Sequence, residues 1–413
     1  MKSSAITAVG IDVSKNKSMV AVRRPGGEIV MHPFEVCHTN DDLNWLASTL
    51  KKLGGDIRIV MEHTGNYWRP LALTLKKAGF FVSVVNAMLI HEFSDNSIRK
   101  LKTDRADSLK IANYALTFWN ELPPFNDEEE TRLLLKTQSR MYERITTTAT
   151  ALKNGLIALS DQTFAGVNLI FDDATKSTEG HFKWVDFFMH YWHRDCVCKF
   201  TFEAFMESYR SWCKKKKYRF RSEIAQKVYE SAKKSVLTLP KCESTKILIT
   251  QACKSLNAIC EAKQACQCEM QRLASLLPEY DIVMSMEGAG PVTGPILMAE
   301  IGDVRRFKNK KALVAFAGVD APPFQSGAFE SKSRHVSKRG SPHLRRTLFT
   351  VSGIILQLSH RENQVVCFMD KKRSEGKHFY VYMIAGAAKF LRIYYATVTR
   401  YLKTVGNPGF ANS

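Results

Sequence analysis

Hydrophobic and polar positions alternate in two different ways along the chain. In the first third, short apolar runs occupy residues 5–13, 18–24 and 28–36, and Pro25-Gly26-Gly27 turns the chain between the second and third runs. Runs of this length that are rich in Val, Ile and Ala and bounded by turn residues predict β-strands. Because the connections are short, we expect an antiparallel meander.

Helices and strands are predicted to alternate after this meander. The expected elements are a helix capped by Asn40 and ending near Leu53, a strand at 57–61, a helix at 67–78 ending at Gly79, a strand at 80–85, and a helix at 103–119 before Pro123-Pro124. Three antiparallel strands followed by alternating helices and strands is the order of the ribonuclease H-like (RuvC-like) fold, an α/β fold with a mixed sheet. We assign this fold to residues 1–125.

Two long helical patterns occupy most of residues 126–279 and predict coiled-coil helices, which either pack together or dimerise. The spaced positions of the first are Leu134, Gln138, Met141, Ile145, Thr148, Leu152 and Leu159, and those of the second are Ile249, Ala252, Leu256, Ile259, Lys263, Cys266, Met270, Leu273 and Leu277. Between them, aromatic and basic residues at about 160–240 predict an inserted helical subdomain. Pro278 ends the second helix, and residues 280–413 are expected to form a mainly helical C-terminal domain.

Charge narrows the class of partner. The 413 residues contain 60 Lys and Arg against 40 Asp and Glu, a formal charge of +20, so we expect a polyanionic partner and foremost a nucleic acid. The sequence lacks an apolar run long enough for a membrane span and an N-terminal signal pattern, which predicts a cytosolic protein without membrane partners. The ten cysteines are then expected to be free thiols.

Basic residues concentrate in two segments. Residues 208–236 hold ten Lys or Arg against two Glu, which fits a solvated helix face as well as a nucleic-acid contact. Residues 303–346 hold eleven Lys or Arg against three acids, interleaved with small and hydroxyl residues, which indicates contact with phosphates. The candidate phosphate ligands are Lys308, Lys310, Lys311, Arg334, Lys338, Arg339, Arg345 and Arg346.

Four acids stand where the predicted N-terminal fold could gather them. Asp12 and Glu62 end predicted strands, and Asp104 and Asp107 share one face at the start of a predicted helix. Phosphoryl transfer on DNA requires such a set, because two magnesium ions about 4 Å apart need several oxygen ligands. Each acid also has a plainer explanation: Asp12 as a turn residue, Glu62 as a buried partner of a neighbouring cation, and Asp104 as a helix cap.

The C-terminal part carries two weaker signals. Gly288, Gly290 and Gly294 precede an apolar helix and resemble a helix-hairpin-helix element, although a plain connection between helices has the same pattern. Ser326 follows two prolines in a turn-like segment that could expose its hydroxyl. Residue chemistry alone does not distinguish it from the serines at 331, 333, 337 and 341.

The ordered motifs GIDVSK, MEHTG, KTDRAD, EGAGPVTG, ALVAFAGV, FQSG and SKRGSPHLRR resemble the DEDD-type insertion-sequence transposases, also described as bridge-RNA-guided recombinases, and related site-specific invertases. The resemblance covers about residues 5–120 and 280–400. Two features depart from the pattern: His63 stands where alanine is more usual, and the insert is longer than in compact members.

By matching position, the resemblance implies that Asp12, Glu62, Asp104 and Asp107 form the metal-binding tetrad for Mg²⁺ or Mn²⁺ and that Ser326 is the nucleophile. It further implies donor and target DNA as substrates, a structured noncoding guide RNA (the bridge RNA), and a homo-oligomer, a dimer of dimers, with a site shared between subunits. The expected location is the bacterial cytosol, in association with the nucleoid.

The sequence therefore predicts an RNA-guided DNA transposase or recombinase that cuts and rejoins strands through a covalent phosphoserine intermediate. Two alternatives remain open. One is a RuvC-like, structure-selective endonuclease of the Holliday-junction resolvase type, in which water attacks, and the other is a nucleic-acid-binding protein without catalytic activity.

Overall fold

A computed structural model describes residues 6–63, 65, 67–94, 103–125, 130–171, 177, 179–322, 325–326, 329–330, 335–358 and 362–406. The chain forms two compact units, Met1–Asp127 and Glu128–Ser413. Across these ranges, every helix is too short or too polar to cross a lipid bilayer.

The first unit is built on a five-stranded sheet with the strand order β3-β2-β1-β4-β5. Strands β1, β2 and β3 pair antiparallel, whereas β4 pairs parallel with β1, and β5 pairs parallel with β4. The strand bounds are β1 Ile6–Val13, β2 Lys17–Arg23, β3 Ile29–Cys37, β4 Asp56–Glu62 and β5 Phe81–Val85, with a short 3-10 turn at Pro25–Gly27. This mixed topology confirms the predicted ribonuclease H-like fold.

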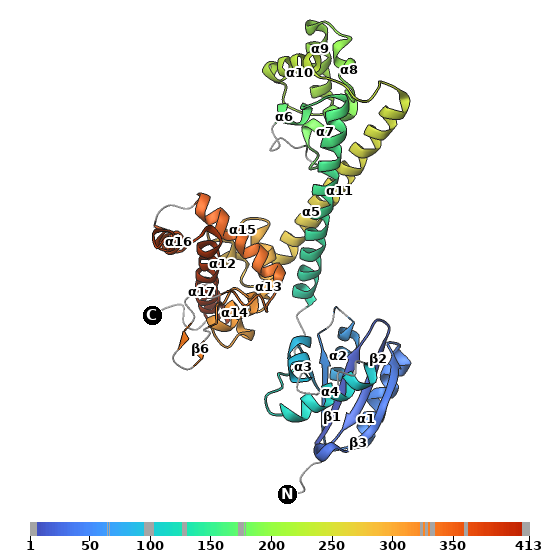
Figure 1. Cartoon of the computed structure of the whole chain (residues 1–413), viewed down its shortest axis with the longest axis vertical. Coiled ribbons are helices and arrows are strands. Elements are labelled where there is room, and N and C mark those ends of the chain that lie inside the picture. Colours follow the sequence, from blue (N-terminus) through green and yellow to red (C-terminus); the bar gives the residue numbers. More distant parts are fainter. Residues whose placement is uncertain are drawn as a thin grey trace. The chain divides into compact units, whose positions relative to one another are not determined.

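Helices cover both faces of the sheet (Figure 1). Helices α1 (Asn40–Leu53) and α2 (Trp68–Lys77) pack on the face of Ile11 and Met61. Helices α3 (Ala87–Ser94) and α4 (Asp104–Thr117) pack on the opposite face, that of Ala8 and Val60. Helix α3 was not predicted from the sequence.

The prediction that Asn40 caps helix α1 is wrong by one residue. Thr39 is the cap, because its hydroxyl accepts a hydrogen bond of 3.2 Å from the Asp42 backbone N–H, and Asn40 is the first helical residue. Threonine serves as well as asparagine here, since both place an oxygen within reach of the free N–H groups of the first turn.

A single glycine sets how closely helix α4 approaches strand β1. A Cβ atom at Gly10 would lie 2.3 Å from both the Ala112 nitrogen and the Ser108 oxygen. No heavy atom can be accommodated at that distance from backbone, so any side chain at this position pushes the helix away from the sheet.

Two long helices organise the second unit. Helices α5 (Glu130–Thr163) and α11 (Glu243–Ser275) run side by side within one chain, so they pack together as one of the two predicted alternatives (Figure 1). Helix α11 buries most of the expected register, including Ile249, Leu256 and Met270, whereas the expected positions Ala252, Ile259 and Lys263 are half-buried.

The predicted contact face of α5 is wrong by about one residue. Leu134 and Met141 are 47% and 51% exposed, whereas Leu135 and Tyr142 are buried. The true face also contains Arg132, which forms a buried, bidentate ion pair with Glu279. A prediction from hydrophobic periodicity treats arginine as a surface residue. It therefore chose the adjacent face of the helix, which contains Leu134 and Met141, as the contact face.

The insert is a helical subdomain at one end of the long helices, with its own core (Figure 1). Its aromatic residues fill that core: Trp184, Phe187, Phe205 and Tyr209 are at most 1% exposed. Its helices are α6 Val167–Ile170, α7 Lys183–His190, α8 Asp195–Cys198, α9 Phe202–Lys215 and α10 Ser222–Lys234.

The C-terminal helices pack at the other end of the long helices (Figure 1). Their bounds are α12 Tyr280–Met284, α13 Thr293–Ile301, α14 Lys310–Ala317, α15 Pro342–Leu358, α16 Gln364–Ser374 and α17 Phe379–Gly406, with a 3-10 turn at Val304–Arg306 and two short strands, β6 Gln325–Ser326 and β7 Phe329–Glu330.

Glycines in this part serve internal packing. A Cβ at Gly288 would meet Ile355 at 2.8 Å, and one at Gly294 would meet the Met284 sulfur at 2.5 Å. These two residues therefore favour the plain connection between helices over a phosphate-binding hairpin. Gly340 and Gly318 allow the motifs SKRGSPHLRR and ALVAFAGV to cross, because a Cβ at Gly340 would lie 2.1 Å from the Phe316 oxygen.

We expect Gly10→Ala to destabilise the N-terminal unit by about 3 kcal/mol, since the added methyl group overpacks the contact between strand β1 and helix α4. Hydrogen–deuterium exchange of peptides from β1 and α4 measures this local effect. Gly155→Ala is the control, because a methyl group added at that helical glycine would point into open space. It should stabilise helix α5 by about 0.5–1 kcal/mol. Unchanged exchange in Gly10→Ala would contradict the close contact.

Candidate functional site

Asp12 and Glu62 lie at the same end of two neighbouring parallel strands. The register between β1 and β4 pairs Ile11 with Met61, so the two acids occupy the next position along each strand. Ile11 and Met61 point into the core beneath helices α1 and α2. Because side chains alternate along a strand, Asp12 and Glu62 face the other side of the sheet, where helix α4 lies.

Helix α4 supplies the other two acids. Thr103 caps it by accepting a hydrogen bond of 3.2 Å from the Ala106 N–H, so Asp104 is not the cap. Asp104 and Asp107 occupy the first turn, immediately before Ser108, whose carbonyl lies against Gly10. The contact at Gly10 thereby brings the first turn of α4 beside Asp12, two residues farther along β1.

The electrostatics of Asp12 reflect this gathering. Burial and, to a smaller extent, the negative charges of Glu62, Asp104 and Asp107 together raise the pKa of its carboxyl group from an ordinary 3.8 to about 6. The structure therefore brings together all four acids that the sequence singled out. A group of carboxylates gathered this closely is suited to hard divalent cations, which coordinate oxygen and offset the repulsion between the negative charges.

Two lysines that the sequence analysis did not single out stand beside the acids. Lys110 forms an ion pair of 2.8 Å with Asp107 across one turn of α4. Lys17 pairs with Glu35 at 2.7 Å and lies close enough to Asp104 for that carboxylate to help raise the Lys17 pKa. Both lysines follow the acids closely in sequence, within GIDVSKNK and DRADSLK. This spacing is too common to have marked them as functional residues.

Ser326 belongs to the second unit. Its backbone lies in strand β6, which pairs antiparallel with β7 in a short hairpin in which Ser326 is opposite Phe329. The role of its hydroxyl stays a prediction.

The predicted phosphate ligands differ in their exposure to solvent. Lys308, Lys310, Lys311, Lys338 and Arg339 are exposed, and Arg334 lies outside the described residues. Arg345 is half-buried and donates a hydrogen bond of 3.2 Å to the Ala317 carbonyl. Arg345 therefore has a structural contact within the C-terminal domain, whereas the exposed lysines remain suited to phosphates.

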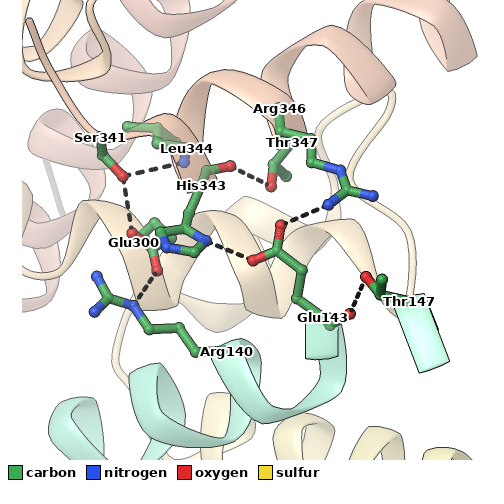
Figure 2. A network of polar contacts seen from close by, with 9 residues as sticks. All are labelled: Arg140, Glu143, Thr147, Glu300, Ser341, His343, Leu344, Arg346 and Thr347. Atoms are coloured by element: carbon green, nitrogen blue, oxygen red, sulfur yellow. Dashed lines mark hydrogen bonds and ion pairs between the residues drawn. The ribbon is translucent and has the colours of Figure 1, made fainter. Parts of the chain in front are cut away.

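A polar network holds the start of helix α15 against helices α5 and α13 (Figure 2). Glu143 accepts hydrogen bonds from His343 and Arg346, at 2.5 and 2.9 Å. Buried Glu300 accepts from Arg140 at 3.2 Å and from the Ser341 hydroxyl at 3.1 Å. The motif SKRGSPHLRR is thus fixed in position, and Arg346 keeps a side chain that is 66% exposed.

The insert contains a separate group of possible ligand atoms. Atoms of Glu179, His181 and Glu261 lie within 4.8 Å of one another, and His181 Nε2 is 2.7 Å from Glu261. His181 also lies 3.6 Å from buried Asp186 through its other nitrogen. Because both ring nitrogens face carboxylates, we interpret this group as a link between the insert and helix α11.

Most of the insert's aromatic rings are unavailable for stacking on bases, because they pack in its core or against it. Its lysines at 214–217 are exposed, so the basic part of the segment is available to a partner. All ten cysteines are free thiols, as expected.

Known proteins resemble both ends of the chain. Residues 9–165 match a DEDD-type family described as Transposase, and residues 280–365 match the Transposase IS116/IS110/IS902 family. An uncharacterized 43.6 kDa protein of insertion element IS110 from Streptomyces coelicolor is 19% identical over 89% of this chain and 88% of its own length. The pilin gene-inverting protein of Moraxella bovis is 21% identical over 95% of each chain.

Among solved structures, RuvC of Thermus thermophilus in complex with a Holliday junction substrate is 11% identical, with a TM-score of 0.24, and covers 29% of this chain and 99% of its own. The two family matches lie on either side of the insert, on the segments that carry the motifs described above. The chain belongs to the DEDD-type IS116/IS110/IS902 family of transposases, and it is an enzyme that acts on DNA.

Proposed function

We propose that the protein cleaves and rejoins DNA strands at a metal-dependent site formed by Asp12, Glu62, Asp104 and Asp107. The observation that supports this most strongly is the convergence of the four carboxylates on one corner of the sheet, where their charges help to raise the Asp12 pKa to about 6. Without a cation, such a group costs free energy, which a purely structural role does not explain.

The donor set fits Mg²⁺ or Mn²⁺, because all four groups offer carboxylate oxygens. When bound, the cations would supply Lewis-acid stabilisation of the charge that develops on the scissile phosphate. Asp12 and Glu62 would hold them from the rigid sheet, and Asp104 and Asp107 from the helix. Exposed lysines such as Lys308, Lys310 and Lys311 would bind flanking phosphates.

For rejoining, we propose Ser326 as the nucleophile. Its Oγ would form a bond to phosphorus while the bond from phosphorus to the 3′ oxygen breaks, and the hydroxyl proton would pass to that oxygen, releasing a 3′-hydroxyl. A 3′-hydroxyl of the partner duplex would reverse the step and release the serine. The phosphodiester energy is retained, so strands exchange without ATP.

The resemblance in the sequence motifs supports a guide RNA that pairs with donor and target DNA, and a dimer of dimers in which the tetrad of one subunit meets Ser326 of another. In such a scheme base pairing reads the sequence and the basic surface holds the backbone. Purified protein that is treated with ribonuclease and then supplied with its native noncoding RNA tests the guide: activity should be lost and regained.

Asp12→Asn should lower magnesium-dependent strand cleavage by more than about 100-fold, because a metal ligand is lost. Cleavage of labelled donor DNA measures this. The control is Asp41→Asn, which neutralises an exposed acid at the start of helix α1 in the same domain. Full activity of Asp12→Asn would overturn the metal site.

The raised Asp12 pKa predicts how metal binding depends on pH. Below about pH 6 the cation must displace a proton from Asp12, so its affinity should fall about tenfold per pH unit, and above pH 7 it should be constant. Without a cation, in EDTA, the free energy of unfolding should change in the opposite direction. It should fall as the pH rises from 3.8 to about 6, because the folded unit holds the Asp12 proton more tightly than the unfolded chain does. Calorimetry and thermal melts would show both trends in the wild type and neither in Asp12→Asn.

Ser326→Ala distinguishes the serine mechanism from its hydrolytic alternative. We expect the wild type to form a protein–DNA adduct that survives denaturation and the variant to form none and to lose recombination, with metal binding intact. If water is the nucleophile, as in a resolvase, the variant still cleaves and neither protein forms an adduct.

Mixing Asp12→Asn with Ser326→Ala tests the shared site. If tetrad and serine come from different subunits, mixed assemblies regain part of the recombination activity, because some sites combine two intact halves. If both come from one chain, every site carries a defect and the mixture stays inactive.

A further inference from the structure

Aromatic rings gather on the surface of the C-terminal domain, where helices α15 and α17 meet. Tyr380 lies nearly parallel to His378 and to Phe349, with ring centroids 5.6 and 6.0 Å apart and interplanar angles of 29° and 28°. Phe379 packs edge-on against Tyr380 and Tyr382, at 5.3 and 5.4 Å. We call His378, Tyr380 and Phe349 the aromatic column.

Tyr380 and the adjacent Phe379 are open to solvent, whereas Phe349 is half-buried against the core of the C-terminal domain. Tyr380 is 62% exposed and Phe379 43%, and the following Val381 is 51% exposed. The rings of the insert show the contrast, since Trp184, Tyr209 and their neighbours are almost fully buried. Exposed rings do not gain the hydrophobic free energy that burial in the core would give them. Contiguous apolar patches of this kind usually mark contact surfaces.

Several cations lie close to the column in sequence. Lys371 and Arg373 lie in the last turn of helix α16, Lys377 follows before α17, and all three are exposed. Of the acids nearby, Glu375 is paired with Lys372 at 2.7 Å and Asp370 is exposed. On helix α15, Arg346 precedes Phe349 by three residues, which places both on one face; Arg346 pairs with Glu143 at 2.9 Å and keeps a side chain that is 66% exposed. This charge pattern favours a polyanion over an apolar protein surface.

We propose that the aromatic column binds unpaired bases of a nucleic acid by stacking, while the flanking cations contact the phosphates. Every base has a flat π-face, so rings of this kind bind single strands with little sequence preference. Duplex DNA offers its bases only at the groove edges and cannot stack here. The ligand is therefore a single-stranded segment, from melted DNA or from a loop of RNA.

Binding to the column can be measured without catalysis. The measurement is fluorescence anisotropy in EDTA, which removes any metal-dependent binding at the tetrad. The labelled probes are single-stranded DNA, RNA of the same sequence, the matching duplex and an abasic single strand. Comparing them separates stacking on bases from contact with phosphates. Wild type should bind the normal single strand more tightly than the abasic one. Tyr380→Ala should weaken single-strand binding about tenfold and abolish that difference, leaving the duplex affinity unchanged.

Matched variants make the result specific. Tyr380→Phe keeps the ring and should bind like the wild type, and Trp45→Ala, which removes a 51% exposed ring from the N-terminal unit, should have no effect. Preference for DNA or for RNA identifies the source of the strand. Equal losses for single strand and duplex, or an unchanged affinity, would overturn the proposal.

A change in oligomeric mass of Tyr380→Ala in sedimentation, with single-strand binding intact, would also overturn it and assign the column to a contact between copies of the chain. Asp12→Asn should bind the single strand normally. A failed cleavage assay and a failed binding assay can therefore be told apart.

Discussion

The close approach of helix α4 to strand β1 at Gly10 is the contact on which the candidate site depends. Apolar residues of α4, such as Ile111 and Ala115, pack on Ala8 and Val60 of the sheet. This burial holds Asp104 and Asp107 beside Asp12 although the acids repel one another. The fold thus stabilises, before any cation binds, an arrangement that electrostatics alone would disperse, and a preorganised site spares the cation the cost of assembling its ligands.

A similar principle governs the second unit, where polar contacts fix elements that apolar packing leaves free to slide. Arg132 and Glu279 form a buried ion pair between helix α5 and the start of α12, and Glu143 and Glu300 hold the first turn of α15. Breaking a buried pair by removing one partner leaves an uncompensated charge, so these contacts have one favourable register. The basic motif before and within α15 is thereby held on a rigid support.

Strand positions, the alternation of the first domain and the four acids could be predicted, because they depend on local periodicity and on the chemistry of single residues. The contact face of α5 could not be predicted, because it contains Arg132 and Ser139. Both residues are buried, but a pattern of hydrophobic positions assigns polar residues to the surface. The role of Gly10 could not either, since its constraint comes from Ala112, about a hundred residues away. Ser326 was found by resemblance, and physical reasoning from its neighbours would not have selected it.

Aromatic residues show why composition is a weak guide to binding. The segment 160–240 combines rings with lysines, as nucleic-acid-binding surfaces do, yet most of its rings pack in or against a core, while its lysines at 214–217 face solvent. The segment KHFYVY at 377–382 is shorter and less basic, but Phe379 and Tyr380 remain exposed because α17 turns its later residues, such as Met383 and Ala387, toward the core. The same residue types therefore form a core in one segment and a surface in the other. Which of the two they form depends on the face of the helix on which they lie. If the exposed lysines of the insert bind the phosphate backbone and the aromatic column binds unpaired bases, the lysines can bind duplex and single strands alike, whereas the column binds single strands.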